Sequence, residues 1–223
     1  MRIRCKPWAR PELEGCDFFI SSPDELKGHW REQFACKDAP LYLELGCGKG
    51  GFISQAFCDD KSKNYIAVDI KNEMLVLAKR KIEEQMKAQQ TGSENVRIFI
   101  KNIMQIDNVF DKSDAIDRIF INFCNPWPKP KHRKRRLTHL RQLLLYKEFL
   151  KGDIWFKTDD DQLFKESLVH FDEAGFDVAY KTYDLHNSEY SRQSYVTEHE
   201  KMFSQQGIKI KFLIANKRPE TKL

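Results

Sequence analysis

Short apolar runs alternate with amphipathic segments along most of the chain. The apolar runs predict buried strands at residues 41–45, 64–70, 95–100, 118–123, 154–158, 176–182 and 208–216. Apolar residues at helical spacing predict helices at residues 51–60, 75–86, 138–150 and 160–174. This alternation is typical of an α/β fold with an open, mostly parallel seven-stranded sheet and helices on both faces. Ligands of such sheets bind beyond the carboxyl ends of the strands.

The first 38 residues precede this pattern and are basic near their start. Ser22, followed by Pro23 in the first turn, predicts a helix that runs to Phe34. We expect residues 1–38 to form a basic N-terminal arm and helix packed on the core, and residues 39–223 to form that core. A length of 223 residues suits a single domain overall.

The composition excludes a membrane protein. Hydrophobic residues make up 41% of the chain and charged residues 32%, and the mean hydropathy is -0.63. No aliphatic run is longer than four residues, and no apolar stretch follows the basic N-terminus as it would in a secretory signal. We therefore expect a cytoplasmic protein that makes no membrane contact. No Cys or His spacing resembles a metal site, so none is expected.

Positive charge is concentrated in one short segment. The formal net charge is +5, and six cations lie in residues 129–136, which leaves about -1 for the rest of the chain. They are Lys129, Lys131, Arg133, Lys134, Arg135 and Arg136. Such a concentration indicates a localised polyanionic partner, for which nucleic acid is the natural candidate.

A glycine-rich turn follows the first predicted strand. Gly46, Gly48 and Gly51 satisfy G-x-G-x-x-G, so a dinucleotide must be weighed against S-adenosylmethionine. Glu44 lies two residues before the first glycine. Its carboxylate would repel a pyrophosphate but attract the ammonium and sulfonium groups of S-adenosylmethionine, which favours the methyl donor.

The next two strands also end in polar residues. Asp69 can accept hydrogen bonds from both ribose hydroxyls of a nucleoside, in either class of cofactor. Asn102 can hold the adenine, although an isolated Asn at such a position is often a turn residue. Both side chains are therefore candidate contacts to the nucleoside half of the cofactor.

A proline-rich loop follows the fourth strand. Three prolines at alternate positions remove amide donors and hold their neighbours extended. The resulting stiff loop projects Asn125, Trp127 and Lys129 at the carboxyl edge of the sheet. An aromatic ring suited to stacking on a base, together with a basic stripe beside the methyl-donor site, indicates RNA as the substrate.

The chain resembles the bacterial tRNA (guanine-N7-)-methyltransferase family, which modifies guanine 46 in the tRNA variable loop. The matching stretches are LELGCGKGGF (43–52), NFCNPWPKPKHRKRRL (122–137), FKTDD (156–160), DLHNS (184–188) and VTEHEKMF (196–203). The resemblance implies a Rossmann-like, class I S-adenosylmethionine-dependent methyltransferase fold. It implies cofactor contacts by Glu44, Asp69, Asn102 and Asn125, and substrate contacts by Lys129, Asp159, Thr197, Glu198, His199 and Glu200.

One position departs from the family pattern. The usual motif is D-P-W-P-K, whereas this chain has Asn125, so a carboxylate role cannot be transferred to it. Guanine N7 carries an in-plane lone pair and no proton, so direct attack on the methyl carbon requires no general base. The change to Asn125 is therefore compatible with activity, and rate enhancement would come chiefly from alignment and exclusion of water.

Carboxylates near the base are the remaining candidates for catalysis. Asp159 and Glu200 could bind the guanine edge and stabilise the positive charge that develops on the purine. With Asn125 they form the predicted catalytic set, while Arg133, Arg135 and Arg136 join Lys129 as predicted phosphate contacts. Asp159 could instead cap the following helix, and Thr197 to Glu200 could form a capping box.

Other functions stay open from the sequence. An exocyclic-amino methyltransferase fits because Asn125-Pro-Trp is similar to the [D/N]-P-P-[Y/F/W] loop of such enzymes, although the basic continuation favours the N7 reaction. A catalytically silent RNA-binding subunit is a further alternative, but such a subunit would not need the intact glycine loop that follows Glu44, which argues against it. A nicotinamide oxidoreductase is the weakest alternative, because Glu44 would repel its pyrophosphate. Monomer and homodimer both suit the size.

Overall fold

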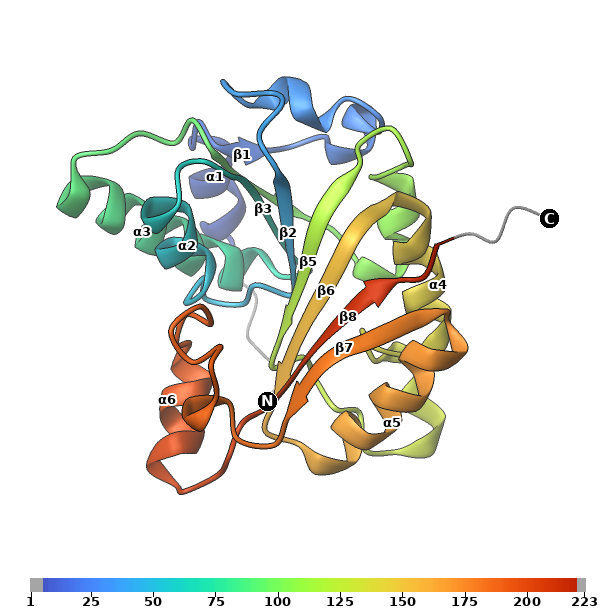
Figure 1. The fold of residues 1–223 in the computed structure, drawn as a ribbon. Coiled ribbons are helices and arrows are strands. Elements are labelled where there is room, and N and C mark those ends of the chain that lie inside the picture. The colour runs from blue at the N-terminus through green and yellow to red at the C-terminus, as the bar shows by residue number, and fades with distance from the viewer. Residues whose placement is uncertain (1–5, 220–223) are drawn as a thin grey trace.

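The computed structural model describes residues 6–219 as an eight-stranded sheet with helices on both faces (Figure 1). Across the sheet the strand order is β1-β4-β3-β2-β5-β6-β8-β7. Among the strands of this described part, only β8 runs antiparallel to its neighbours. The strands are β1 (Phe19–Ile20), β2 (Leu41–Leu45), β3 (Asn64–Asp69), β4 (Val96–Ile100), β5 (Ile116–Asn122), β6 (Leu150–Thr158), β7 (Phe176–Thr182) and β8 (Lys211–Lys217). The predicted α/β class and all seven predicted strands are confirmed, and β1 is additional.

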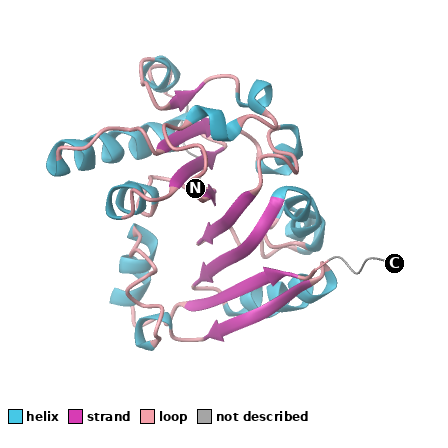
Figure 2. Ribbon diagram, turned by 45° about the horizontal axis from the view of Figure 1, so that its top comes forward, coloured by secondary structure: helices cyan, strands magenta, loops and turns pink. Residues whose placement is uncertain are grey.

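Helices cover both faces of this sheet (Figure 2). They are α1 (Ala9–Glu14), α2 (Ile53–Asp59), α3 (Asn72–Gln89), α4 (Leu140–Phe149), α5 (Asp161–Glu173) and α6 (Glu198–Gln205). Short 3-10 turns are η1 (Pro23–Leu26), η2 (Trp30–Gln33), η3 (Ile103–Asn108), η4 (Pro130–Arg135) and η5 (Leu185–Asn187). The four helices predicted from apolar spacing are all present, with ends that differ by a few residues.

The N-terminal segment differs from the prediction of one helix from Ser22 to Phe34. It contains α1, the edge strand β1, and then η1 and η2 separated at Gly28. The amides of Gly28 and Trp30 donate to the carboxylate of Asp114, at 2.9 and 3.1 Å, rather than to helical carbonyls. These bonds to a distant residue divide the expected helix. Arg2 and Arg4 of the expected basic arm lie outside the described residues.

The central strands are buried on both faces, which explains their nearly continuous apolar sequence. Leu43 of β2 and Ile66 of β3 belong to the core packed beneath η3, α4 and α5. Tyr65 and Ala67 belong to the second core, beneath α1, α2 and α3. Sequential strand residues therefore serve opposite cores, as the period of two requires.

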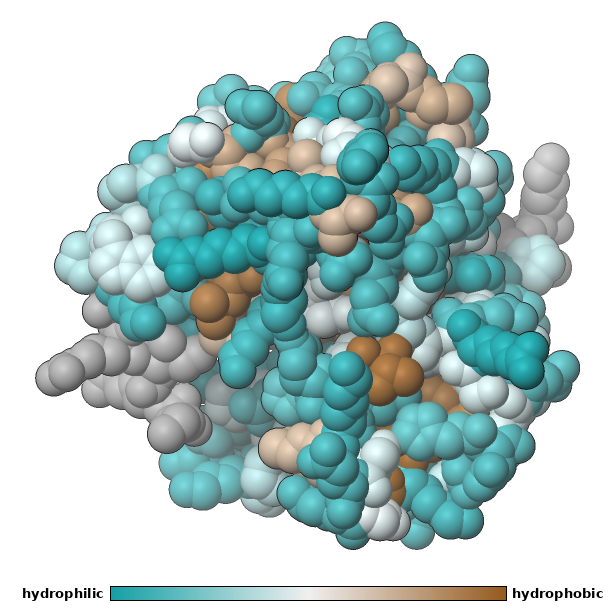
Figure 3. All heavy atoms as spheres, turned by 90° about the vertical axis from the view of Figure 1, so that its left-hand side faces the viewer, coloured by the Kyte–Doolittle hydropathy of each residue, from teal (hydrophilic) through white to brown (hydrophobic). Residues whose placement is uncertain are grey.

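The carboxyl ends of β2, β3, β5 and β6 meet at one edge of the sheet, and α6 lies beside that edge (Figure 1). The side of the molecule that carries α2, α3 and α6 is mostly hydrophilic, with small hydrophobic patches (Figure 3). Within residues 6–219, the helices lack the length and apolar character needed to cross a membrane.

Candidate active site

The glycine-rich loop connects β2 to α2 at the carboxyl edge. Its backbone has positive φ at Gly46 (76°) and Gly48 (55°), and the amide of Gly46 donates to the carbonyl of Val68 at 2.9 Å. Gly50, at φ 77°, lies against α3, where a Cβ would come within 2.7 Å of the Cα of Ala78. Backbone conformation and close packing both require glycine here. The loop is thereby held against β3 and α3 with its backbone open to a ligand.

Glu44, at the end of β2, has one carboxylate oxygen without a partner. Its side chain is buried, and Oε1 accepts a hydrogen bond from Nδ2 of Asn122 on β5 at 3.0 Å. Oε2 is buried and has no hydrogen-bond partner among the described residues. Burial raises the pKa of Glu44 to about 7, while the bond from Asn122 and the charge of Lys157 act to lower it. Such an oxygen is suited to a cationic or N–H donor group of a ligand.

Asp69 lies at the end of β3, where the prediction placed it beside the glycine loop. Its Oδ2 accepts from the amide of Gly48 at 3.0 Å, and its Oδ1 accepts from the amide of Lys71 at 2.9 Å. Burial raises the pKa of this carboxyl, and the backbone donors oppose the shift. The two amides fix the carboxylate in position while each oxygen keeps a further lone pair for a hydroxyl donor.

A cavity of about 180 Å³ lies between the glycine loop and α6. It brings together Glu44, Gly46, Gly48, Thr197, Glu198 and His199, which were all predicted site residues, with residues that were not predicted. The latter are Cys47, Lys49, Phe52, Asn122, Phe123 and Met202. Gly51, the third glycine of the motif, also lines it. A single cavity therefore joins the predicted cofactor loop to the predicted substrate segment.

Helix α6 begins at this cavity. Thr197 caps it, with Oγ1 accepting from the amide of Glu200 at 3.3 Å, so the capping prediction is confirmed for Thr197. The reciprocal half of a capping box is not formed, because the Glu200 carboxylate bonds elsewhere. Glu198 forms an ion pair with Lys81 of α3, and the His199 ring stacks 6.2 Å from the ring of Phe123.

The Glu200 carboxylate points into the protein, which differs from the expectation that it faces the guanine. It is buried, with Oε2 2.6 Å from Nζ of Lys157 on β6 and Oε1 2.8 Å from Nε2 of His186. Lys157 also donates to Oγ of Ser194 at 2.9 Å and to the carbonyl of Tyr195 at 2.7 Å. Both oxygens of Glu200 are therefore engaged in holding α6.

Asp69 adjoins the loop but does not line the cavity between the loop and α6, and two further predicted cofactor contacts also lie outside it. Asn102 is exposed after β4, where its side chain accepts from the amide of Met104 at 3.1 Å and caps η3. Asn125 is exposed after β5, and its Oδ1 accepts from the amide of Trp127 at 3.0 Å. Both side chains thus serve as turn residues.

Asp159 follows β6 at the same edge and is half-buried. The alternative that it caps α5 is wrong, because Asp160 provides the cap: its Oδ1 accepts from the amide of Leu163 at 2.6 Å. Burial raises the pKa of the Asp159 carboxyl, and the negative charge of Asp160 adds to the shift. The structure leaves this carboxylate free of the capping role.

The basic segment divides into internal and exposed cations. Arg136, predicted to contact phosphate, is 1% exposed: its Nε donates to the carbonyl of Pro126 at 2.6 Å and its guanidinium pairs with Glu166 of α5. Arg133 also pairs with Glu166, at 2.9 Å. The prediction is therefore corrected for Arg136, which secures the proline loop to α5 and has no exposed charge to offer an RNA.

The other cations of the segment are available at the surface. Lys129, Lys131, Lys134 and Arg135 are all exposed. The guanidinium of Arg135 lies 5.3 Å from the ring centre of Trp127, and the His132 ring lies 5.7 Å from it on the same loop. Four positive side chains and one partly covered indole thus face solvent beyond the carboxyl edge.

Asn122 and Lys157 were missed by the sequence analysis. Each is the polar residue near the end of an apolar strand, in the sequences IFIN and IWFK, and they are register partners in β5 and β6. A polar side chain within a strand that is buried on both faces is a detectable signal, because its burial requires a partner. Within residues 6–219, no group of three or more His, Cys, Asp or Glu side chains is placed to hold a metal ion.

Comparison with known proteins gives consistent matches. Residues 38–213 match a family model described as "Putative methyltransferase". The tRNA (guanine-N(7)-)-methyltransferase of Clostridium beijerinckii is 58% identical over 97% of this chain and 99% of its own. The 16S rRNA methyltransferase KamB superposes with a TM-score of 0.59 at 12% identity, covering 85% of this chain and 91% of its own. A Streptomyces coelicolor geranyl diphosphate C-methyltransferase, solved with S-adenosyl-L-homocysteine, has a TM-score of 0.50 at 16% identity and covers 81% and 73%.

Proposed function

The chain belongs to the bacterial tRNA (guanine-N7-)-methyltransferase family, and on that premise we propose that it methylates N7 of guanine 46 in the tRNA variable loop. S-adenosylmethionine is the methyl donor. The observation that carries the proposal is the partnerless, buried Oε2 of Glu44 at a glycine loop whose backbone is open to a ligand. Relatives of the same name match over nearly the full length of the chain.

The residues at the glycine loop fit this donor. Oε2 of Glu44 lacks a partner that an ammonium group would provide, and we propose that Asp69 accepts from ribose hydroxyls with the lone pairs that its two backbone hydrogen bonds leave unused. When bound, S-adenosylmethionine supplies an electrophilic methyl group on a sulfonium centre. The chain's own contribution on this side is to hold and orient that group. Phe52 and Phe123 line the cavity and would help to exclude water from it.

The guanine side requires different chemistry. Guanine N7 has a lone pair and no proton to lose, so no residue is needed as a general base. We propose Asp159 as the carboxylate that recognises the guanine edge, because its side chain is not used as a helix cap. We assign Glu200 to holding α6, since both of its oxygens are already paired. Asn125, at the family's aspartate position, shapes the proline loop through its bond to Trp127.

The tRNA would approach the carboxyl edge of the sheet. Lys129, Lys131, Lys134 and Arg135 are exposed there, and we propose that they bind backbone phosphates without reading sequence. Because free tRNA is present in the cytoplasm, we place the enzyme in that compartment.

The test is incubation of the purified protein with radiolabelled S-adenosylmethionine and unmodified tRNA transcript, followed by nucleoside analysis. We expect 7-methylguanosine, lost when guanine 46 is replaced in the transcript and strongly reduced in Glu44→Gln. Label in an exocyclic amino group would support the amino-methyltransferase alternative. Tight tRNA binding without label would support a silent RNA-binding subunit.

A further inference from the structure

Lys157 is a buried lysine whose side-chain hydrogen bonds all reach one distant segment. It lies on β6 and its side chain is 2% exposed. Its three bonds go to Ser194 Oγ, to the carbonyl of Tyr195 and to Glu200 Oε2, at 2.9, 2.7 and 2.6 Å. An ammonium group has three donors, so its capacity is fully used.

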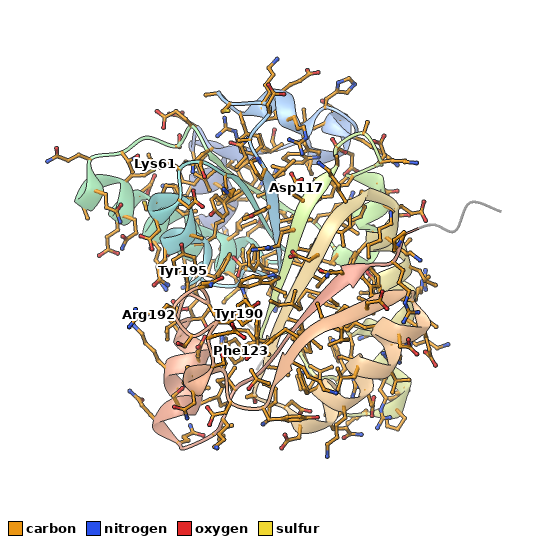
Figure 4. The ribbon with its side chains drawn as sticks, viewed as in Figure 1. Lys61, Asp117, Phe123, Tyr190, Arg192 and Tyr195 are labelled. Carbon is orange, nitrogen blue, oxygen red and sulfur yellow. The ribbon has the colours of Figure 1, made fainter. Side chains whose placement is uncertain are left out.

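These three acceptors belong to residues 184–206, here termed the cap segment. The cap segment supplies one wall of the cofactor cavity through Thr197, Glu198, His199 and Met202. Its aromatic side chains also pack on the strands and loop: Tyr195 lies 5.5 Å from the ring of Phe52. Figure 4 shows Tyr190, Tyr195 and Phe123 gathered where the cap segment meets the strands.

We propose that Lys157 is a positioning residue for methyl transfer, which fixes the cap segment over the cofactor cavity. This inference rests on the proposed function, which assigns the cavity wall to binding of the cofactor and the guanine. Lys157 itself does not line the cavity. It acts through Ser194, Tyr195 and Glu200, and thereby sets the position of Thr197 and His199 opposite the glycine loop.

A contribution to the stability of the fold does not by itself explain the buried ion pair of Lys157 and Glu200. Removing two charges from water is costly, and a buried ion pair can often be replaced by apolar side chains without loss of stability. The Lys157 ammonium also acts to lower the pKa of Glu44, which favours the ionised form that a cationic ligand requires. Lys157 therefore acts on both walls of the cavity: its hydrogen bonds hold the cap segment, and its charge favours the ionised form of Glu44 on the other side.

Three variants test the proposal. Lys157→Met removes the donors and the charge, whereas Lys157→Met/Glu200→Met removes the ion pair without leaving an unmatched carboxylate. Ser194→Ala removes only one acceptor of the Lys157 ammonium group, so it tests the proposal even if the Lys157 variants fold poorly. Lys217→Met is the matched control, because Lys217 on β8 donates to the carbonyls of Lys147 and Leu150, away from the cap segment.

We would measure the Kd of S-adenosylhomocysteine by calorimetry and amide hydrogen exchange across residues 194–206. If the unanchored segment is ordered for only a tenth of the time, apparent affinity falls about tenfold. We expect about that loss in both Lys157 variants, a loss of roughly two- to threefold in Ser194→Ala, and faster exchange in the cap segment but not in β2 or β3. KM for S-adenosylmethionine should rise more than kcat falls, since saturating ligand restores the ordered segment.

Wild-type affinity and wild-type exchange in the cap segment of folded Lys157 variants and of Ser194→Ala would overturn the positioning role. Equal effects in Lys217→Met would do the same, because they would reflect general destabilisation. These outcomes are separate from failure of the proposed function, in which the wild-type protein itself would neither bind S-adenosylhomocysteine nor methylate tRNA.

Discussion

Glu44 and Glu200 are both buried carboxylates at the same edge of the sheet, and their partners give them different roles. Glu200 is matched by Lys157 and His186, so its charge is neutralised within the protein. Glu44 accepts a hydrogen bond from the neutral side chain of Asn122 and forms no ion pair among the described residues, and burial raises its pKa to about 7. A buried carboxylate whose charge is poorly compensated indicates a binding function rather than a stabilising one.

The pKa of Glu44 predicts a pH dependence of cofactor binding. Below about pH 7 the free protein holds a proton on Glu44, and this proton competes with a ligand ammonium group. The affinity for S-adenosylhomocysteine should therefore rise with pH and be about tenfold weaker at pH 6 than at pH 8. Calorimetry over this range measures it.

Glu44→Gln supplies the control for that pH profile. It keeps the shape of the side chain but cannot ionise, so we expect weak binding with a nearly flat profile between pH 6 and 8. A wild-type profile that is equally flat would assign the ammonium contact to another group.

Arg136 and Arg135 are neighbours in sequence with opposite expected phenotypes. Arg136→Ala removes a buried side chain and leaves the Pro126 carbonyl and Oε2 of Glu166 without their donor, while Oε1 of Glu166 keeps Arg133; the protein should be destabilised by about 3 kcal/mol. The melting temperature should then fall by roughly 6–12 °C. Arg135→Ala should leave the melting temperature nearly unchanged but weaken tRNA binding, since this side chain is exposed. Thermal scans and filter binding on both variants measure these effects. If Arg136 is instead a phosphate contact, Arg136→Ala will weaken tRNA binding without lowering the melting temperature.

At the scale of elements, the glycine loop depends on how closely it approaches α3. In Gly50→Ala, the new Cβ would lie 2.7 Å from both Cα and Cβ of Ala78, in a backbone conformation with φ 77°. We expect a loss of about 3 kcal/mol in unfolding free energy from overpacking and backbone strain together. Chemical denaturation measures this loss.

Gly207→Ala is the matched control for that substitution. Gly207 has a similar φ of 74°, but no atom lies within 4 Å of the position of its Cβ. Only the backbone strain remains, so a loss of about 1 kcal/mol is expected. Equal losses in the two variants would show that contact with α3 contributes little.

Local sequence pattern was sufficient for the elements whose own residues determine them. The apolar strands and the loop from Glu44 to Gly51 were predicted because their signals lie within a few residues. β1 was missed since two residues carry no periodicity, and it forms only by pairing with β4. Gly28 was not recognised as a break because its amide bonds to Asp114, 86 positions away.

The same limit applied to the site. The role of Arg136 depends on Glu166, and that of Glu200 depends on Lys157, 43 positions earlier in the chain. A charge run predicts exposed cations, and nothing in the run itself marks the one that turns inward. By contrast, Glu44 could be assigned from sequence because the glycine loop that marks the site follows it directly, although its hydrogen-bond partner Asn122, 78 positions away, could not.

At the scale of the whole molecule, the two edges of the parallel sheet differ in chemistry. The carboxyl edge holds the cavity, the acidic side chains Glu44 and Asp69, and the exposed part of the basic segment. The opposite edge also carries exposed lysines, at positions 37, 112 and 151, each in the segment that leads into a parallel strand or at its beginning. Exposed positive charge is therefore present at both edges, and the proposed function requires that the tRNA binds at the carboxyl edge.

Two triple variants with the same change in net charge test which edge binds tRNA. Lys129, Lys131 and Lys134 changed to Gln should weaken tRNA binding and reduce the slope of log K against log salt by about two to three, because each phosphate contact contributes roughly 0.7–0.9. Lys37, Lys112 and Lys151 changed to Gln should leave that slope close to the wild-type value. Long-range attraction between a cationic protein and RNA would lower both slopes equally, whereas direct phosphate contacts at the carboxyl edge lower only the first. Filter binding between 50 and 200 mM salt separates the two cases, and calorimetry with S-adenosylhomocysteine should give wild-type affinity for both variants.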